Sequence, residues 1–410
     1  MQRFTFCNLL VIILLAIQIT SYSQQADKVM VVVIDGARYT ETFGDPSYTY
    51  IPRMKELATQ GTIISNFKND GYTYTSRAIP ALWCGAWTGV QSITYNGAST
   101  QFTNLPSIFE YYRKQKDMPA NECFYILKYI SSLWLPSFDD DYGQEYWPTF
   151  NSTGSTDRDV ANQTQQIIDS QQPHFLWVYL ADVDAAGHSG NWNQYTRSIE
   201  IADSIVGVLW DRVQAHPFYQ NTTTLLVTND HGRHDDQHGG FKGHGCTCNG
   251  CRQMQFLAVG PDIKQNFVSS QPRVLPDFAV TASYILGINP EKSTGNVMHE
   301  IFNSTSVKHI DNSNFTLQGS FPNPFSESTR IRYTLSKTSK VKLSVYSVTG
   351  ALVSTLVSET QNEGEHSVIW NGYDAYGNHL PQGVYILRLV VDRAQKSIAV
   401  VRLANKKTWN

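Results

Sequence analysis

The chain lacks an excess of charge of either sign. Its 32 lysine and arginine residues are balanced by 35 aspartate and glutamate residues, which gives a formal net charge of −3 at pH 7. A protein that holds the phosphate backbone of a nucleic acid needs a strongly basic surface. We therefore expect no polymeric nucleic acid among the partners of this protein.

Long hydrophobic runs are also scarce. The apolar run from Leu9 to Ile19 is shorter than the roughly 20 residues that a membrane-spanning helix needs. It follows Arg3 and precedes Ser21 and Ser23, small residues at the spacing that a signal peptidase uses. Residues 1–23 are therefore predicted to be a cleaved secretory signal, with no transmembrane anchor, and the protein is expected to be secreted or at the cell surface.

Cysteine is sparse, and its number after signal cleavage is odd. Loss of Cys7 leaves five thiols, at Cys84, Cys123, Cys246, Cys248 and Cys251. At least one of them must then be free or paired with another molecule. In an oxidising compartment the CTCNGC cluster is expected to form disulfides rather than a zinc knuckle, with a connectivity that the sequence leaves open.

Three short stretches carry the strongest chemical signals. They are Val31–Gly36 (VVVIDG), Asp184–His188 (DAAGH) and Val227–Gly232 (VTNDHG), and His244 follows in FKGHG. In VVVIDG an apolar β-type run stops abruptly at the carboxylate Asp35. In VTNDHG a similar run is followed by the carboxylate Asp230 and then by His231. An α/β protein presents its ligands at strand ends in this way.

Together the stretches supply a set of metal-ligand side chains. These are three carboxylates and three imidazoles: Asp35, Asp184, Asp230, His188, His231 and His244. Such a mixture suits zinc better than calcium or magnesium. Six donors are too many for one tetrahedral ion, whereas two divalent ions with three protein ligands each fit the two-metal arrangement for displacement at phosphorus. Singly, each motif would also fit a turn aspartate or a solvated loop histidine.

The pattern between the motifs alternates strand and helix. The apolar run Phe175–Leu180 is followed by Tyr195, Ile199, Ala202, Val206 and Leu209 at helical spacing. Further short apolar runs occur at Leu225–Thr228 and Phe256–Val259. This βαβ pattern predicts an α/β domain over residues 24–310, with a mostly parallel sheet covered by helices on both faces.

The ordered series VVVIDG, Thr75, DAAGH, NDHG and GHG resembles the alkaline phosphatase superfamily, nearest its nucleotide pyrophosphatase/phosphodiesterase branch, over roughly Lys28 to Pro290. The resemblance implies an alkaline-phosphatase-like fold. It also implies one metal held by Asp184, His188 and His244, and a second held by Asp35, Asp230, His231 and the nucleophile hydroxyl. Asp182, expected on the same strand face, competes with Asp184 for its place.

The same resemblance implies a hydroxyl nucleophile that opens a helix closed by glycine. Counting back from Gly85 places this role at Thr75, with Thr73 and Ser76 as near misses. A hydroxyl needs a bound cation to act as an alkoxide, and a helix N-terminus offers amides to phosphoryl oxygens. The alternative for Thr75 is a helix-capping hydroxyl.

Arg77 is a candidate for substrate binding, because its planar guanidinium could reach a phosphate oxygen. The alternative is that Arg77 lies on a solvated helix face.

Two features depart from the family pattern. Pro80 replaces a proline just after the nucleophile, and Cys84 replaces the threonine before the closing glycine. Either could shift the register of the nucleophile by a residue or two.

The implied reaction is hydrolysis of a small phosphoric ester through a phospho-threonine at Thr75, with either a monoester or a diester as substrate. A sulfatase-like hydrolase is disfavoured because Gly36, not a second acidic residue, follows Asp35. A cell-surface binding module that keeps the metals without turnover is the alternative of a different class. A phosphoglycerate mutase relative is disfavoured by secretion, since phosphoglycerates are cytoplasmic.

After about Asp311 the helical pattern is replaced by short alternating strands, such as Val341–Tyr346 and Val384–Leu389, which predicts a small immunoglobulin-like β-sandwich over residues 311–410. This region resembles the C-terminal sorting domain of the type IX secretion system at Phe321–Phe325, Val341–Gly350, Trp370–Gly372 and Leu380–Tyr385. The resemblance implies export through the periplasm, with the secretion machinery as a partner. An immunoglobulin-like accessory or carbohydrate-binding module is the alternative.

Overall fold

The computed structural model describes residues 26–128, 134–303, 315–348, 351–391 and 394–404. The chain divides into two compact units, Met1–His309 and Ile310–Asn410, and each is described by itself. The predicted secretory signal lies outside the described residues. Among the residues described, no helix is long and apolar enough to cross a bilayer.

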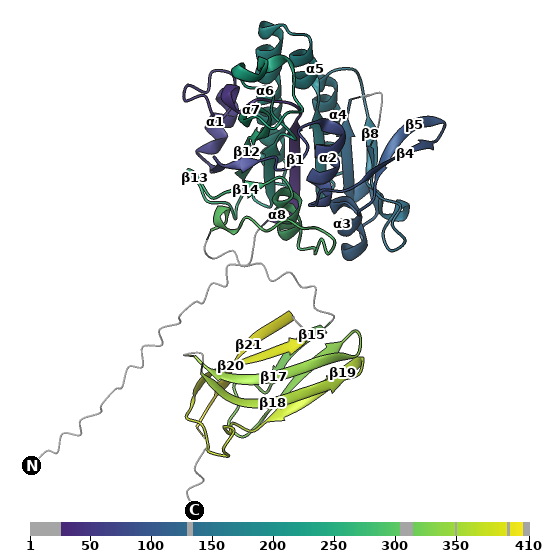
Figure 1. Ribbon diagram of the computed structural model, residues 1–410. Coiled ribbons are helices and arrows are strands. Elements are labelled where there is room, and N and C mark those ends of the chain that lie inside the picture. The colour runs from purple at the N-terminus through teal and green to yellow at the C-terminus, as the bar shows by residue number, and fades with distance from the viewer. Residues whose placement is uncertain (1–25, 129–133, 304–314, 349–350, 392–393, 405–410) are drawn as a thin grey trace, which may run out of the picture. The chain divides into compact units, whose positions relative to one another are not determined.

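A large mixed sheet forms the centre of the first unit (Figure 1). Its strands run in the order β13 (Phe267–Ser269), β2 (Gly61–Ile64), β12 (Phe256–Val259), β10 (Thr223–Thr228), β1 (Lys28–Ile34), β9 (Phe175–Leu180), β6 (Cys123–Leu127) and β8 (Thr149–Ser152). Strand β12 is antiparallel to both its neighbours, whereas the other neighbours pair in parallel. Strand β1 therefore lies between two parallel partners, β10 and β9.

Helices cover both faces of this sheet, so its central strands read as continuous apolar runs (Figure 1). One face packs against α1 (Pro52–Ala58), α4 (Asp157–Ser170) and α6 (Trp192–Ala215). The other packs against α2 (Thr75–Cys84), α3 (Ile108–Lys116) and α8 (Asp277–Leu286). Every residue of β1 is buried. Alternate β1 residues, such as Val32, join the first of these cores.

Aromatic side chains fill the second face. The ring of Trp177 on β9 lies 5.5 Å from that of Phe109 on α3 and 5.9 Å from that of Phe278 on α8, both edge to face. Trp83 on α2 packs edge to face on Phe109 at 5.7 Å. Edge-to-face pairs add to the free energy gained by burying the rings, and here they join α2 and the other helices to the sheet.

Short elements complete the first unit. Two small sheets are formed by β3 (Phe67–Lys68), β11 (Gln253–Met254) and β14 (Arg273–Val274), and by β4 (Val90–Tyr95), β5 (Ala98–Thr103) and β7 (Trp134–Leu135). Two short α-helices, α5 (Asp182–His188) and α7 (Asn249–Arg252), carry residues considered below. Short 3-10 helices lie at Tyr39–Glu41, Ala120–Glu122, Gln144–Tyr146, Asp236–His238, Gly240–Lys242 and His299–Ile301.

The second unit is all β. One sheet has the order β15 (Phe315–Phe321), β16 (Thr329–Leu335), β19 (Gly364–Trp370), and the other has the order β18 (Leu352–Gln361), β17 (Ser339–Ser347), β20 (Gly383–Val391), β21 (Ala394–Arg402). Buried and less buried residues alternate along β16, as in a strand with one face on a core. A separate hydrophobic core includes Trp370. The predicted fold class, an α/β domain followed by a small β-sandwich, is confirmed.

The aromatic face provides a test of packing in the first unit. Trp177 is fully buried, so Trp177→Ala should lower the free energy of unfolding by roughly 3 to 5 kcal/mol. Trp192→Ala is the matched control, because Trp192 is already 39% exposed and its loss should cost much less. Denaturant unfolding followed by circular dichroism measures both. Equal losses for the two variants would contradict this assignment of the core.

Candidate metal centre

The predicted ligands meet at one edge of the central sheet. Asp35 follows the end of β1, and Asp230 and His231 follow the end of β10. Because β1 pairs in parallel with β10 and with β9, the carboxyl ends of the three strands lie together. Asp184 and His188 come from α5, which begins directly after β9.

One part of the sequence expectation was wrong. Asp182 and Asp184 were expected on a strand face, but both lie in helix α5. In a helix, residues four apart share a face. This places Asp184 and His188 side by side, with 3.3 Å between the Asp184 carboxylate and the His188 Nε2 atom. Asp182 instead accepts a hydrogen bond from the Asp157 backbone and pairs with Lys128.

The first group of donors is fully buried. Asp35, Asp230 and His231 offer ligand atoms within 4.8 Å of one another. The Nε2 atom of His231 lies 3.4 Å from Asp35 Oδ1 and 3.4 Å from Asp230 Oδ2. Asp230 Oδ2 has no hydrogen-bond partner among the described residues, although a buried carboxylate oxygen normally has one. A carboxyl oxygen without a hydrogen-bond partner that faces an imidazole fits a cation at this position.

The second group shares His231 with the first and is more open to solvent. Asp184, His231 and His244 offer atoms within 4.8 Å of one another. His188 adds a fourth donor, because its Nε2 atom lies 3.0 Å from His244 Nε2. The structure thus brings all six predicted ligands together. It also places His231, expected to serve one metal only, within reach of both groups.

The two central histidines are oriented as metal ligands usually are. His231 Nδ1 lies 2.9 Å from the Gly232 carbonyl oxygen, and His244 Nδ1 lies 3.1 Å from the Thr73 carbonyl oxygen. A carbonyl oxygen only accepts, so each Nδ1 carries the proton and donates it. Each Nε2 lone pair then faces the carboxylates, which is the arrangement that backbone carbonyls enforce on metal-ligating imidazoles.

Burial and mutual repulsion raise the pKa of the buried aspartates. The pKa of Asp35 lies well above its usual value, first because of burial and then because Asp230 and Asp184 are close. Burial is also the main cause that raises the pKa of Asp230, to about 7, and Asp184 raises it further. Without a cation this site therefore disfavours the ionised carboxylates that a divalent metal would stabilise.

The pKa of Asp184 moves in the opposite direction. Burial alone raises it, but His231, Arg233 and His244 outweigh burial and hold the pKa below the usual value. Burial and the neighbouring His231 lower the pKa of His244 to about 4. His244 is accordingly neutral near pH 7, as a metal ligand must be. These donors fit two divalent ions.

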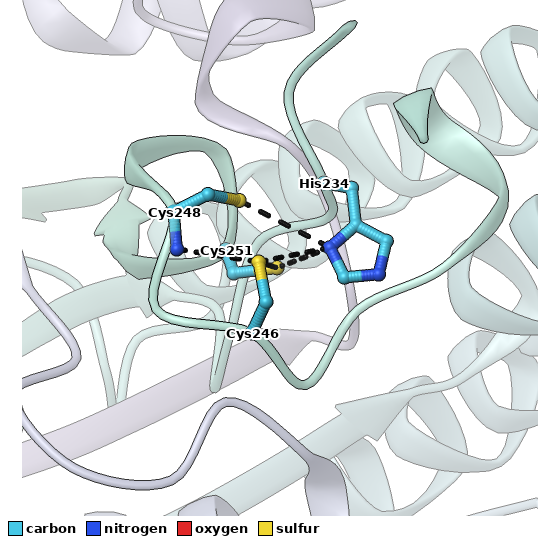
Figure 2. Close-up of side chains that lie close together, drawn as sticks. All are labelled: His234, Cys246, Cys248 and Cys251. Atoms are coloured by element: carbon cyan, nitrogen blue, oxygen red, sulfur yellow. Dashed lines mark hydrogen bonds between the residues drawn. The ribbon is translucent and has the colours of Figure 1, made fainter. Parts of the chain in front are cut away.

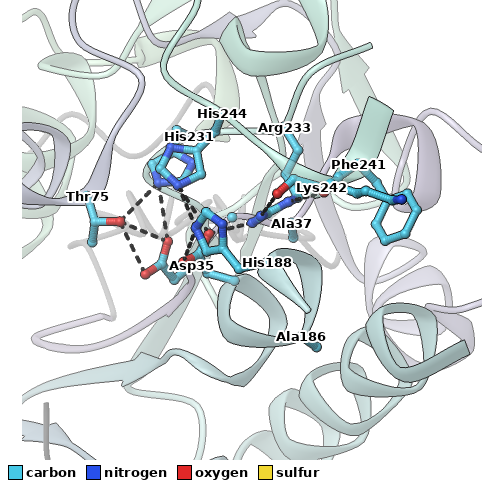
Figure 3. A network of polar contacts seen from close by, with 12 residues as sticks. Asp35, Ala37, Thr75, Ala186, His188, His231, Arg233, Phe241, Lys242 and His244 are labelled. Atoms are coloured by element: carbon cyan, nitrogen blue, oxygen red, sulfur yellow. Dashed lines mark hydrogen bonds and ion pairs between the residues drawn. The ribbon is translucent and has the colours of Figure 1, made fainter. Parts of the chain in front are cut away.

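Thr75 is the first residue of α2 and points into the centre (Figure 3). Its Oγ1 atom lies 3.0 Å from His231 Nε2 and 3.4 Å from Asp35 Oδ1. The N-cap of α2 is Tyr74, whose side chain makes no cap hydrogen bond. Thr75 therefore lies one residue past the cap position, and no side-chain cap bonds to this helix N-terminus. Helix α2 ends at Gly85 in the left-handed conformation, at φ 64°, as expected.

The near misses and Arg77 lie in other surroundings. The Thr73 hydroxyl donates to the Cys246 carbonyl oxygen at 2.7 Å, and Ser76 is half-buried. The Arg77 guanidinium donates to the Thr88 carbonyl oxygen at 3.2 Å and lies 4.6 Å over the Tyr72 ring. Thr73 touches His244 only through its backbone carbonyl oxygen, so among the contacts described for these candidates only the Thr75 hydroxyl touches the ligands.

Several supporting residues escaped the sequence analysis. Arg233 is fully buried and pairs with Asp184, while its guanidinium also donates to the Phe241 and Lys242 carbonyl oxygens (Figure 3). Tyr179 on β9 donates its hydroxyl hydrogen bond to Asp35. The position of Arg233 directly after NDHG was a signal that could have been used.

Gly36 permits the close approach of these groups. It has φ +67°, and a Cβ atom built there would lie 2.7 Å from Asp184 Oδ1 and 2.9 Å from Arg233 Nη1. Contacts that short force a neighbour to shift. The glycine of VVVIDG is therefore required both by the backbone conformation and by the Asp184–Arg233 pair.

The expectation of disulfides was wrong. All five described cysteines are free thiols. Cys84 and Cys123 are buried in the first unit, far along the sequence from the CTCNGC cluster. Within that cluster the sulfurs of Cys246 and Cys251 approach to 3.5 Å, which is a contact rather than a bond.

Comparison with known sequences matches part of each unit to one family model. Residues 145–289 match the Metalloenzyme superfamily, and residues 325–395 match the FlgD Ig-like domain. Over 138 residues the chain is 25% identical to the 2,3-bisphosphoglycerate-independent phosphoglycerate mutase of Clostridium tetani, an alignment that covers 33% of this chain and 26% of the mutase. The match thus spans about a quarter of that relative.

Solved structures show the fold. The murine ectonucleotide pyrophosphatase/phosphodiesterase 5 aligns with a TM-score of 0.51 and 13% identity, over 67% of this chain and 100% of its own. A mutant of the alkaline phosphatase PafA aligns with a TM-score of 0.52 and 11% identity, over 68% and 99%. Sulfatases are further neighbours. The first unit has an alkaline-phosphatase-like fold, and part of its sequence matches the Metalloenzyme superfamily.

The raised pKa of Asp230 predicts an unusual pH dependence for the metal-free protein. Between about pH 4 and pH 7 the unfolded chain ionises this carboxyl while the folded protein keeps it protonated, so the group destabilises the fold as pH rises. In chelator at pH 8, Asp230→Asn should therefore raise the free energy of unfolding, on the order of a few kcal/mol. The gain should vanish near pH 4.

Thermal unfolding in chelator at several pH values measures this effect. The exposed Asp140 provides the control variant Asp140→Asn, which should leave the curve unchanged. A chelator-treated Asp230→Asn protein less stable than wild type at pH 8 would show that Asp230 is already neutralised by its protein neighbours, against the prediction.

Proposed function

We propose that the first unit is a two-metal hydrolase of phosphoric esters, with zinc as the metal and Thr75 as the nucleophile. The observation that carries the proposal is the position of the Thr75 hydroxyl, 3.0 Å from His231 Nε2 and 3.4 Å from Asp35 Oδ1 at a helix N-terminus without a side-chain cap. A hydroxyl nucleophile needs a cation that lowers its pKa and a cradle for the phosphoryl oxygens. The ligand side chains beside Thr75 would hold the cation, and the first turn of α2 would provide the cradle.

The ligands divide into two positions. Asp35, Asp230, His231 and the Thr75 oxygen would hold one ion, and Asp184, His188 and His244 the other. When bound, the two ions would supply Lewis-acid stabilisation of the phosphoryl oxygens and lower the pKa of water to about 7.

Thr75 performs the bond-making step. Its Oγ1 atom, whose proton passes to solvent, forms a bond to phosphorus while the bond to the leaving-group oxygen breaks on the opposite side, and the departing oxygen takes up a proton from solvent. The backbone amides of the first turn of α2 orient the phosphoryl oxygens. A water then attacks the phospho-threonine, which releases phosphate or a nucleotide and restores the Thr75 hydroxyl.

Phosphotransfer to a second hydroxyl is the other candidate, because the sequence relatives are phosphoglycerate mutases. Both reactions share the phospho-threonine and differ in whether water or an alcohol accepts the phosphoryl group. Monoesters and diesters are both within the proposed substrate class. The sulfatase reaction is a weaker candidate, since the helix position that a sulfatase fills with a modified cysteine or a serine holds Thr75 here.

Replacement of the nucleophile tests the proposal. Thr75→Ala should reduce hydrolysis of p-nitrophenyl phosphate and of bis-p-nitrophenyl phosphate by on the order of a thousandfold or more, because the covalent step is lost. Thr75→Ser should retain part of the activity. The preferred ester separates monoesterase from diesterase, and added alcohol acceptors reveal phosphotransfer.

Ser76→Ala is the matched control, since it removes a neighbouring hydroxyl outside the ligand set. Full activity in Thr75→Ala together with loss in Ser76→Ala would move the nucleophile by one residue. A metal-loaded wild-type protein that hydrolyses none of these esters would favour the binding-module alternative.

We further propose that the second unit is a sorting domain of the type IX secretion system and that the protein is exported to the cell surface or medium. The support is the sequence resemblance across residues 321–385 together with the predicted signal at residues 1–23. A FlgD Ig-like match and a sandwich with its own core are compatible with this role and with an accessory module.

Export provides the test of this second proposal. In a host that carries a type IX system, deletion of residues 311–410 should leave the first unit in the periplasm, whereas the full chain should reach the surface or the medium. Immunoblotting of cell fractions with antibodies to each unit measures this. Equal export of the truncated chain, or an intact sandwich on protein recovered from the medium, would count against a cleaved sorting signal.

A further inference from the structure

A second group of metal-ligand side chains lies apart from the residues of the candidate metal centre. His234, Cys246, Cys248 and Cys251 offer ligand atoms within 4.8 Å of one another. Figure 2 shows the three thiols gathered around one ring nitrogen of His234. No member of this group was among the predicted ligands of the two-metal site. We name it the Cys3His cluster.

The distances within the Cys3His cluster are those of a metal-ligand shell. From His234 Nδ1 the sulfurs of Cys246, Cys251 and Cys248 lie at 3.0, 3.3 and 4.0 Å. The sulfurs of Cys246 and Cys251 are 3.5 Å apart. Tetrahedral zinc with Zn–S near 2.3 Å and Zn–N near 2.0 Å separates sulfur from sulfur by about 3.8 Å and sulfur from nitrogen by about 3.5 Å.

We propose that the Cys3His cluster binds one structural zinc ion. Four protein donors close a tetrahedral shell, and the Cys3His set is a common composition of closed zinc sites. Three sulfur donors select zinc over the hard cations calcium and magnesium. Because the shell is complete, this ion has no open position for a substrate and acts on the fold.

A disulfide explains the geometry less well. It would use two of the three sulfurs and would leave the third thiol and the His234 ring without a role. All three sulfurs instead converge on the same nitrogen, which a disulfide does not require. His234 also lies outside the CTCNGC stretch, so the fold brings it to the thiols over a distance of twelve residues from Cys246.

The cluster ties together two segments that shape the candidate metal centre. His234 belongs to the segment that follows His231, and its backbone amide donates to the Gly243 carbonyl oxygen at 2.8 Å. Cys246 follows His244, and its carbonyl oxygen accepts from the Thr73 hydroxyl at 2.7 Å. Zinc at the cluster would therefore hold the His244 loop against the segment that leads to Thr75.

The backbones around the cluster are tightly packed. A Cβ atom on Gly232 would lie 2.0 Å from the Gly250 carbonyl oxygen, and one on Gly250 would lie 2.5 Å from the Arg233 carbonyl oxygen. The Gly232 amide also donates to the Cys251 carbonyl oxygen at 2.8 Å. The close packing of Gly232 and Gly250 brings the His234 segment and the cysteine segment near enough for their four side chains to bind one ion.

Cobalt substitution tests the cluster independently of any activity. The full chain loaded with Co²⁺ should show a sulfur-to-cobalt charge-transfer band, because the candidate metal centre contains only nitrogen and oxygen donors. Cys248→Ser should abolish the band and lower the metal content by one ion per chain. Cys123→Ala, which removes a buried thiol elsewhere, should change neither.

Thiol titration of the wild-type chain provides a second measurement that does not depend on the folding of a variant. Zinc should protect three thiols from a thiol reagent in the folded protein, and a chelator should expose them without a reductant. A requirement for reductant before the thiols react, or a cobalt-loaded protein without the charge-transfer band, overturns the proposal in favour of a disulfide or of free thiols.

Discussion

The structure depends on holding three carboxylates, two buried and one partly buried, at one edge of a sheet. Asp35, Asp230 and Asp184 are held close by strands and a short helix whose positions the hydrophobic core determines. Like charges in a buried site repel one another and lose hydration, and a cation offsets both costs. Arg233 provides part of this compensation at Asp184. The Nε2 lone pair of His231 faces the other two carboxylates, Asp35 and Asp230. A divalent ion would supply the counter-charge that these carboxylates require.

Much of the site could be predicted because the sequence marks strand ends directly. An apolar run that stops at Asp35 or at Asp230 requires only that neighbouring strands be parallel, which the βαβ pattern indicated. The position of Asp184 was harder to predict. In a strand Asp182 and Asp184 would lie on the same face, whereas in a helix they point in different directions. Helix α5 separates Asp184, which joins the ligands, from Asp182, which pairs with Lys128. The sharing of His231 between both groups depends on side-chain directions that no spacing encodes.

The cysteines also show that sequence spacing alone does not determine which side chains meet in the fold. Spacing within CTCNGC is compatible with disulfides and with metal binding, and the expected oxidising compartment favoured the former. His234 favours metal binding over disulfides, but it precedes the CTCNGC stretch, and no fixed spacing marks it as a partner of the thiols. Only the folded backbone, with Gly232 against Gly250, shows that this histidine reaches the thiols. Tyr179, which donates a hydrogen bond to Asp35, also gave no sequence signal, because it lies within an ordinary apolar strand.

The two halves of the candidate metal centre differ in their access to solvent. Asp35, Asp230 and His231 are buried, whereas the His188 side chain is 51% exposed at the outer rim. Ions would therefore enter and leave past His188, and the inner position would fill first and empty last. Two ions bound here would exchange in order: when metal is scarce, the outer ion would be released first, and the protein would pass through a half-loaded state.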